Sequence, residues 1–548
     1  MGKDTRTKAV LSPIMPSEWD ERLARHLLNR AGFGVPRDRV AHLARVGPTA
    51  AVDELVDFED FPSDPDLPDF IPGAEVYLER RRDFESLSQE ERRKARQEFA
   101  VRERGQVRRL QTWWFERMTT TARPLEEKMT LFWHGHFATS AQKIKSARQN
   151  LDLNRLFREH AAGNFKALTI AVGQSPAMLR YLDNVQNVKG KPNENWAREL
   201  MELFTLGQGN YTEDDIKESA RAFTGWTLVQ GRFALRERAH DFGEKTFMGR
   251  TGHFDGWDIL DVIFEQPEAA TFICRKLFEF FAYQDPEPEI VEALASSLRF
   301  HNYEIKPVLR QLFRSKAFYS SKAVGTQIKS PVQFMVQLVR DLHLEEPPYS
   351  AMARASAQLG QNLFFPPNVA GWEGGRAWIN ANTLLARYNI PRTLVVAHMV
   401  EPDEMSMMDM RGMERSRRQA YRDQFQDFLK RQPPDRRRAF RDQMETAKTP
   451  EDRIGIIEQA LFESSTSAHW DLRAAFTDLD FSTARECVDA LSQRFLSRTL
   501  SKRQKAVLAS ALGGERDLGS PLTVEKLTRD RMSSALQLLF SMAEYQLC

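Results

Sequence analysis

The chain has 548 residues, of which 41% are hydrophobic and 28% are charged, and its net charge is +2. This length suggests three or four domain-sized units, at about 150 residues for each. The small net charge gives no global field that would attract nucleic acid or an anionic membrane, so nucleic acid is not an expected partner. The three cysteines are far apart and odd in number, which argues against a disulfide framework and a cysteine-based zinc site.

The N-terminus reads MGKDTRTKAVLSPIMPSEWDERL and lacks the apolar segment of a secretory signal. We therefore expect a cytoplasmic location, although an upstream segment or a different start site would reverse this inference and an exported location stays open. No apolar run is long enough to span a bilayer, so no transmembrane segment is expected. Residues 1–18 are expected to form a flexible tail.

Helical patterns dominate the chain that follows. Short helices are predicted at about residues 18–29 and 37–46, and Gly47-Pro48 ends the second of them. Residues 58–73 are rich in Pro and Asp and predict an irregular connection. A long helix is predicted at about residues 75–119, with a first half rich in Arg and Glu. Short helices joined by brief connections indicate an all-α fold with a compact, bundle-like architecture of many helices.

One stretch, Lys191–Leu228, combines two helices, a tight polar turn and a cluster of carboxylates, asparagines and tryptophans. Its first helix is predicted at residues 194–206, capped by Asn193 and ended by two glycines. Thr212, with Asp215 three residues later, resembles a capping box and predicts the start of the second helix. The acidic start of that second helix would repel phosphates, which argues against a DNA-recognition helix.

Two irregular loops rich in Gly and Pro interrupt the helices. The first covers about residues 229–256, where a short hairpin is the alternative, and the second covers residues 364–378. Composition shifts near residue 400, and residues 411–442 are rich in Arg and Lys. A solvated helical pair is favoured there because acidic residues are interspersed, and a surface that contacts polyanions is the alternative. A final apolar helix is predicted at about residues 524–545.

These patterns divide the chain into three regions. Residues 1–18 form the flexible tail, residues 19–400 a helical core that carries the polar motifs, and residues 401–548 a C-terminal helical region that packs on that core.

Glu199 and Glu202 are the first candidates for chemistry. Three residues apart on a predicted helix, their carboxylates share one face. If that face is buried, repulsion and desolvation would raise one pKa, which suits acid–base catalysis or a hard cation. The alternative is a structural ion-pair network, with Arg198 and Arg221 as partners. We weigh the two interpretations equally.

His134 and His136 flank Gly135. If the glycine ends the helix there, both rings could converge on a divalent metal ion or a substrate. The alternative is two histidines that hydrogen-bond at the C-terminal end of a helix. A His-X-His pair alone is weak evidence of a metal site, so the structural alternative is favoured.

The loops supply further polar and aromatic groups. His240, Asp241 and Lys245 lie in the glycine-rich loop, where capping of the loop's own backbone is the favoured interpretation and a catalytic or substrate-binding role the alternative. Trp372 and Trp378 lie in the second loop and could border a substrate, although tryptophans pack in cores more often.

Several long motifs, in the same order, resemble the domain-of-unknown-function 1800 family of bacterial proteins. They are HLLNRAGFG from residue 26, EKMTLFWHGHFATS from 127, PNENWARELMELFTLGQGNYTEDDIKESARAFTGW from 192, HDFGEKTFMG from 240 and LFFPPNVAGW from 363. The resemblance implies a mainly helical protein and supplies no reaction. It also implies a partner, a protein of a second uncharacterised family that is exported and sulfatase-like. Many relatives carry export signals, and in some a His stands where this chain has Phe204.

Two functional hypotheses follow. In the first, the protein is a metal-dependent or histidine–carboxylate hydrolase. A divalent ion would be bound by His134, His136, Glu199 and Glu202, and catalysis would use Glu199, Glu202, His240 and Asp241. Substrate would contact Asn193, Asn195, Lys245, Trp372 and Trp378. In the second, the protein is a non-enzymatic helical scaffold or assembly factor, and the same polar residues form a buried structural network.

Overall fold

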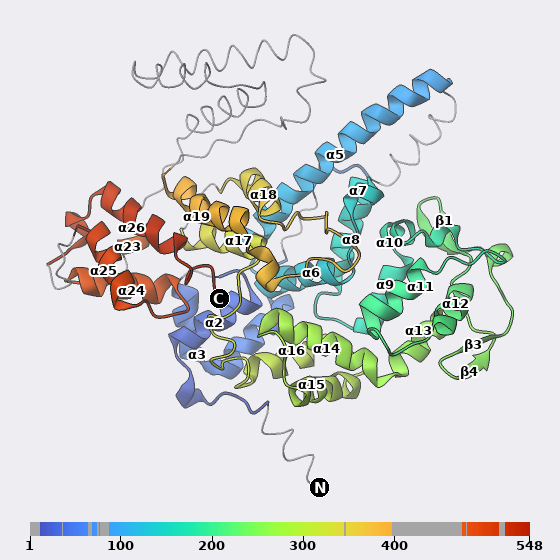
Figure 1. Ribbon diagram of the computed structural model, residues 1–548, viewed down its shortest axis with the longest axis horizontal. Helices are drawn as coiled ribbons and strands as arrows, with labels where there is room; N and C mark the ends of the chain where they lie inside the picture. Colours follow the sequence, from blue (N-terminus) through green and yellow to red (C-terminus); the bar gives the residue numbers. More distant parts are fainter. Residues whose placement is uncertain are drawn as a thin grey trace, which may run out of the picture.

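The computed structural model of the protein describes residues 11–34, 37–63, 68–73, 76, 87–342, 344, 347–396, 474–477, 479–513 and 521–548. Most of these residues are helical, as the sequence predicted (Figure 1). The all-α prediction needs one correction, because the chain also forms two small antiparallel sheets of two strands each. The basic stretch 411–442 lies outside the described residues.

The N-terminal helices follow the sequence closely. They are η1 (Pro16–Glu18), α2 (Glu21–Ala31), α3 (Arg37–Val56) and η2 (Phe58–Asp60). The break predicted at Gly47-Pro48 is present as a kink inside α3, where Gly47 has φ 86°. Of the predicted flexible tail, residues 1–18, the structure describes the part from Leu11 to Glu18, and this part packs on the core. Leu11 and Ile14 are buried, and the amide of Ile14 donates to the carbonyl of Arg314 at 2.7 Å.

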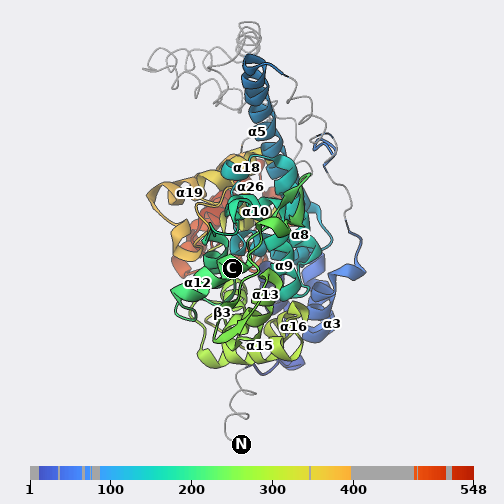
Figure 2. The same ribbon diagram turned by 90° about the vertical axis from the view of Figure 1, so that its right-hand side faces the viewer.

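The long helix α5 (Gln89–Thr120) begins at a capping box made by Ser88 and Glu91. Its charged first half extends away from the rest of the molecule, whereas its second half enters the core (Figure 2). Trp114 and Phe115 in that second half are fully buried. The change from solvated to buried therefore occurs along one helix, at the point where the sequence changes from Arg and Glu to apolar residues.

The helices after α5 surround the motif residues. They are α6 (Pro124–His136), α7 (Ala141–Ile144), α8 (Ala147–Glu159), α9 (Phe165–Gln174), α10 (Pro176–Tyr181), η3 (Asn184–Gln186), α11 (Asn195–Glu199), the π-helix η4 (Leu200–Thr205) and α12 (Glu213–Ala222). The helix predicted at residues 194–206 is thus a short α-helix that continues as a π-helix. The capping box at Thr212 and Asp215 is confirmed.

The glycine-rich segment 229–256 forms hairpins rather than an irregular loop. Its neighbourhood contains β1 (Trp226–Val229), β2 (Arg232–Leu235), η5 (Glu237–Ala239), β3 (Lys245–Phe247) and β4 (Arg250–Gly252). β1 pairs with β2, and β3 with β4. Gln230 and Gly231 join the first pair with φ 51° and 78°, as expected for a two-residue turn that matches the twist of the strands.

Further helices complete the molecule. They are α13 (Gly256–Glu265), α14 (Pro267–Phe281), α15 (Pro288–Phe300), α16 (Ile305–Arg314), α17 (Pro331–Asp341), α18 (Tyr349–Gln358), η6 (Gly375–Trp378), α19 (Ala381–Val396), α23 (Ala474–Thr477), α24 (Ala484–Phe495), α25 (Lys502–Ala511), η8 (Val524–Lys526) and α26 (Arg529–Ser541). The final helix predicted at residues 524–545 is therefore split into η8 and α26.

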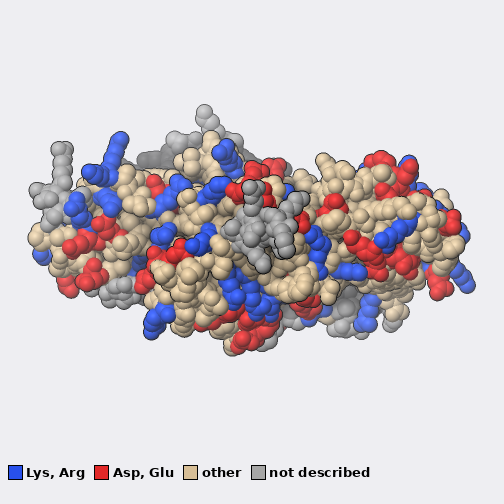
Figure 3. Space-filling model, turned by 90° about the horizontal axis from the view of Figure 1, so that it is seen from below, with Lys and Arg blue, Asp and Glu red and all other residues tan. Residues whose placement is uncertain are grey.

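Buried apolar side chains form two clusters. The first gathers residues from α2, α3, α6 and α8 to α16, including Trp133, Trp196 and Phe204. The second combines α5, α17 and α18 with α24 to α26, so that Trp114 and Leu536 belong to one core. The C-terminal helices thus share a core with helices of the predicted region 19–400. On the face shown in Figure 3, cationic and anionic side chains are interspersed.

Candidate functional site

The His-Gly-His segment lies at the end of α6, which continues through Gly135 to His136. The helix does not end at the glycine, so the two imidazoles, two residues apart, take different environments. His134 packs against the rings of Trp114 and Phe157, with centroids 4.7 and 4.8 Å away. Burial lowers the pKa of His134 to about 3, which keeps the ring neutral.

His134 accepts a hydrogen bond from Asn154. The distance from Asn154 Nδ2 to His134 Nε2 is 3.1 Å. Asn154 Oδ1 in turn accepts from Arg158 Nη2 at 2.8 Å, which fixes the orientation of the amide. An amide nitrogen can only donate, so His134 Nε2 is the acceptor and the ring proton is on Nδ1. This imidazole is thus one end of a polar chain that leads to Arg158.

The centre of that chain is Glu127, a fully buried carboxylate that the sequence analysis did not single out. Arg117 Nε donates to its Oε1 at 2.5 Å, and Arg158 Nε donates to the same oxygen at 2.6 Å. Trp114 Nε1 donates to Oε2 at 2.8 Å. The two guanidinium groups outweigh the burial that opposes them and lower the pKa of Glu127 to about 2. Glu127 lies seven residues before His134, a helical spacing that could have indicated the shared face.

His136 bonds to a different part of the molecule, the end of the π-helix η4. Its Nε2 lies 2.9 Å from the carbonyl oxygen of Phe204, so Nε2 carries the proton and donates. Burial is the main cause that lowers its pKa well below the ordinary value, and the positive charge of Lys276 adds to it. Lys276 Nζ donates to the carbonyl of Leu203 at 3.2 Å and lies 3.5 Å from His136 Nδ1.

The end of η4 explains why these donors gather there. The last carbonyls of a helix lack partners within the helix. Here the carbonyls of Leu203 and Phe204 accept from Lys276 and His136, and that of Leu206 accepts from Asn210. Side chains thus cap the end of the π-helix. The favoured prediction was a pair of histidines that hydrogen-bond at the end of a helix, and His136 does so at the end of η4 rather than of its own helix α6. Lys276 was missed because it lies on α14, far along the chain.

Glu199 is the last residue of α11, and Glu202 lies on η4. Glu202 accepts from Gln208 at 2.7 Å and from the hydroxyl of Tyr211 at 3.0 Å. Glu199 is half-buried and has no hydrogen bond or ion pair within the part of the chain that the structure describes. Burial, followed by the charge of Glu202, raises the pKa of Glu199.

The arginines proposed as partners of this carboxylate pair are bonded elsewhere. Arg198 pairs with Glu194 and Glu213, and Arg221 pairs with Glu218 and Asp241. Neither arginine forms an ion pair with Glu199 or Glu202 in the described structure, although the charge of Arg198 partly offsets the rise in the pKa of Glu199.

His240 and Asp241 lie between β2 and β3, and Lys245 is the first residue of β3. His240 Nδ1 lies 2.8 Å from the carbonyl oxygen of Thr224, and Asp241 Oδ2 accepts from Arg221 at 2.8 Å. Lys245 Nζ donates to the backbone carbonyls of Asp241 and Gly243 at 2.6 and 2.9 Å. Lys245 thus caps the backbone of its own loop, as the favoured interpretation predicts, whereas His240 and the bond from Arg221 to Asp241 attach the loop to the end of α12.

The predicted substrate-binding residues occupy several places. The predicted cap at Asn193 needs a correction, because α11 begins at Asn195 and its N-cap is Glu194, which makes no side-chain cap bond. Asn193 Oδ1 instead accepts from the amide of Asn195 at 3.0 Å. Trp378 is buried. Trp372 is half-buried beside the end of α6, since a Cβ placed on Gly135 would meet its ring at 3.8 Å. The structure thus brings Trp372 to the His-Gly-His turn.

The four predicted metal ligands do not gather around one point. His134 bonds to Asn154, His136 to the end of η4, and both oxygens of Glu202 to Gln208 and Tyr211. Within the described ranges, no group of three or more His, Cys, Asp or Glu side chains could hold a metal ion. A divalent ion bound by all four residues does not fit this arrangement. The catalytic and substrate-binding roles stay predictions.

These features define a mostly helical protein in which several polar motif residues bond to neighbouring helices and loops. The family model described as "Protein of unknown function (DUF1800)" matches residues 26–547, nearly the whole chain. The protein belongs to this family, as its motifs predicted. No curated protein and no solved structure matches the chain. Among the helices that the structure describes, none has the length and apolar character needed to cross a membrane.

Proposed function

We propose that the protein is a non-enzymatic helical scaffold or assembly factor, in which the polar motif residues form a structural network. The observation that carries this proposal is the partnering of the three histidines that were predicted as site residues. His134 bonds to Asn154 on α8, His136 to the end of η4, and His240 to the carbonyl that follows α12. Each imidazole therefore joins segments that are distant in sequence, and each has a separate task.

The chemistry of these groups supports a structural role. Burial keeps His134 and His136 neutral, so they act as fixed donors or acceptors rather than as groups that titrate near neutral pH. A satisfied buried network of this kind rigidifies a fold and specifies one packing arrangement. The client that we propose is a protein of the exported, sulfatase-like family, as the family resemblance implies.

The test is complex formation between the full-length protein and purified sulfatase-like protein from the same bacterium, followed by size-exclusion chromatography. We expect co-elution with the wild-type protein. We expect it also with Glu199→Gln, because a scaffold does not need an acid–base group. Separate elution of the two folded proteins at micromolar concentrations would contradict the scaffold proposal for this partner.

A second candidate function rests on Glu199. Its carboxyl is half-buried and without a partner among the described residues, its pKa is raised, and it borders a π-helix. Raised pKa values suit a carboxyl group for general acid catalysis, and π-helical turns are frequent at functional sites. In this candidate, Glu199 donates a proton and Glu202, oriented by Tyr211, supplies the neighbouring negative charge.

A panel of chromogenic esters, phosphate esters and glycosides tests this hydrolytic candidate. Glu199→Gln should abolish any hydrolysis by the wild-type protein and leave thermal stability unchanged, because the side chain gives up no bond. Glu202→Gln is the matched comparison, since it loses a bond to Tyr211 as well as charge. Hydrolysis that persists undiminished in Glu199→Gln would eliminate this candidate.

A further inference from the structure

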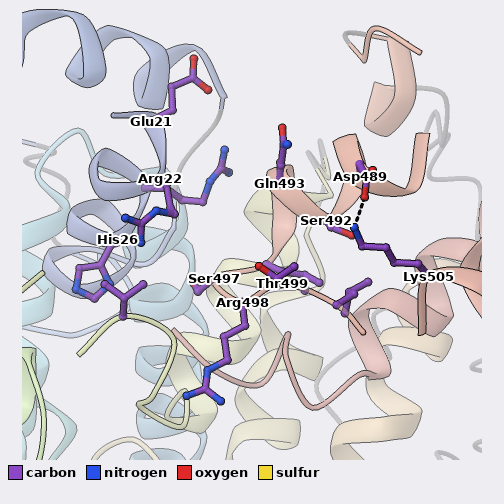
Figure 4. Close-up of a pocket in the computed structure, with 14 residues that line it drawn as sticks. Glu21, Arg22, His26, Asp489, Ser492, Gln493, Ser497, Arg498, Thr499 and Lys505 are labelled. Atoms are coloured by element: carbon purple, nitrogen blue, oxygen red, sulfur yellow. Dashed lines mark hydrogen bonds and ion pairs between the residues drawn. The ribbon is translucent and has the colours of Figure 1, made fainter. Parts of the chain in front are cut away.

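A cavity of about 360 Å³ lies between α2 and the C-terminal helices α24 and α25, away from the polar motif network. Figure 4 shows Glu21, Arg22 and His26 on one wall, with Gln493, Ser497, Thr499 and Lys505 on the opposite wall. Pockets that bind small molecules have volumes of about 300–1,000 Å³. This one is at the lower end of that range and suits a small ligand.

Cations outnumber carboxylates in the lining of the cavity. Four cations contribute to it, and the carboxylates are those of Glu21 and Asp489. Asp489 is already paired with Lys505 Nζ at 2.5 Å. Arg25 donates to the carbonyl of Arg494. The two remaining cations, Arg22 and Arg498, are therefore the ones that can turn to a ligand.

Arg22 and Arg498 approach the cavity from different parts of the chain. Arg22 is largely exposed. Its Nε lies 4.0 Å from Asp20 Oδ2, and an exposed ion pair at this distance is weak. Arg498 is exposed and has no hydrogen bond or ion pair to any residue in the described ranges. Its side chain crosses Gly325, where a Cβ would lie 2.7 Å from Arg498 Cγ. Both residues line the cavity. A guanidinium group donates paired hydrogen bonds to a phosphate or carboxylate, so either arginine suits such a ligand.

His26 adds a second, independent indication of a ligand. Its side chain lines the cavity and is 2% exposed. Nε2 lies 2.9 Å from the carbonyl oxygen of Phe318, so Nε2 carries the proton. Nδ1 is then an acceptor, and it is buried without a hydrogen-bond partner in the described structure. A buried acceptor without a partner is costly, so a ligand that donates a hydroxyl proton to Nδ1 would relieve that cost.

We propose that this cavity binds a small hydroxylated anion, a sugar phosphate or sugar acid, with Arg22 and Arg498 at its anionic group and His26 Nδ1 at a hydroxyl. The proposal goes beyond the scaffold function and is independent of it, because none of these three residues belongs to the network around Glu127 or η4. It also gives a role to the first residue of the HLLNRAGFG motif, which the scaffold proposal leaves unused.

Isothermal titration of the full-length protein at low ionic strength tests the proposal, with glucose 6-phosphate, glucuronate, inorganic phosphate and glucose as probes. We expect glucose 6-phosphate or glucuronate to bind. The probe that binds more tightly shows whether the anionic group of the ligand is a phosphate or a carboxylate. Arg22→Gln and Arg498→Gln should each weaken binding about tenfold or more, as for loss of a charge-assisted hydrogen bond. Arg45→Gln, at an exposed position on α3, is the control and should bind like the wild type.

His26→Gln tests the hydroxyl contact. It should lower the affinity for glucose 6-phosphate towards that of inorganic phosphate, and circular dichroism checks that the variant folds. Because Arg22 and Arg498 are exposed, their variants test the site even if His26→Gln fails to fold. Three results would overturn the proposal: no binding of either sugar anion, equal binding by wild type and both arginine variants, or equal affinity for glucose and glucose 6-phosphate. Inorganic phosphate that binds as tightly as glucose 6-phosphate would refute the role of His26.

Discussion

Replacement of Glu127 by Gln should destabilise the protein more than any other single change in the polar network. The substitution preserves shape and removes the charge that two buried guanidinium groups share. Arg117 and Arg158 have side chains that are only 5% and 11% exposed, so water cannot replace the carboxylate. A Gln side chain has one acceptor oxygen, whereas Glu127 accepts through both oxygens, including the bond from Trp114.

The magnitude follows from two arguments that agree. Removal of one partner from a buried ion pair costs about 3–5 kcal/mol. The lower end applies here because Glu126 Oε2 lies 3.6 Å from Arg117 and can take up part of its charge. The pKa of Glu127 is lowered from 4.5 to about 2. At 1.36 kcal/mol for each pKa unit, this difference corresponds to about 3 kcal/mol of stabilisation at neutral pH.

Urea unfolding followed by tryptophan fluorescence and circular dichroism measures this loss. If the two probes give the same transition, unfolding is two-state and a free energy of unfolding can be calculated. Trp114 donates to the carboxylate and is one of the ten tryptophans that contribute to the fluorescence signal. Glu213→Gln is the matched control, since it breaks the exposed ion pair with Arg198 and should leave the unfolding transition nearly unchanged. A loss below about 1 kcal/mol in Glu127→Gln would refute the view that this carboxylate holds the buried cations.

The same variant gives a pH signature with a definite sign. A carboxyl whose pKa is lower in the folded than in the unfolded state contributes stability above the unfolded value and loses it as the pH falls. For Glu127 that window runs from 4.5 down to about 2. The stability difference between wild type and Glu127→Gln should therefore shrink across this window. A difference that stays constant to the acid end of the window would contradict the assignment.

Further variants probe the loops and the end of η4. Gly371→Ala should cost about 2 kcal/mol or more in a thermal unfolding assay, because its Cβ would lie 2.0 Å from a carbonyl oxygen at the end of α6. Gly374→Ala has a similar φ of 77° and open space, so only about 1 kcal/mol of backbone strain is expected. Burial lowers the pKa of Lys276 to about 8, so wild type should gain stability over Lys276→Met as the pH rises from about 8 to 10.5. Elemental analysis should find no stoichiometric divalent metal. One equivalent in wild type that is lost in His134→Ala and Glu202→Ala would restore the metal hypothesis.

Local signals in the sequence predicted much of the fold. The capping box at Thr212 and the break at Gly47 depend on neighbours within a few residues, and both are present. The π-helix η4 was not predictable in this way, because the apolar spacing of residues 194–206 fits an ordinary α-helix equally well. The hairpins between residues 226 and 252 were foreseen only as an alternative to an irregular loop.

The candidate site could be predicted only in part because its bonds cross the chain. His136 depends on Phe204 and Lys276, and Lys276 lies 140 residues after it. Pattern and spacing identify polar residues on a helix, but they do not reveal which carbonyl or guanidinium group arrives from a distant segment. For the same reason, Arg198 and Arg221 were plausible partners for the carboxylate pair, yet both bond to other acids.

One arrangement relates the scaffold proposal to the ligand cavity. His26, His136 and His240 each place one ring nitrogen 2.8–2.9 Å from a backbone carbonyl, those of Phe318, Phe204 and Thr224. That bond is structural in all three, so any remaining chemistry depends on the other nitrogen.

In His136 the second nitrogen, Nδ1, faces Lys276, whose own pKa is lowered beside it. In His26 the second nitrogen is buried, lacks a partner in the described structure and belongs to a residue that lines a cavity with two uncommitted arginines. A neutral imidazole held by one nitrogen and open at the other is a preorganised acceptor. Of these two imidazoles, His26 is therefore the one to which a ligand can add a hydrogen bond.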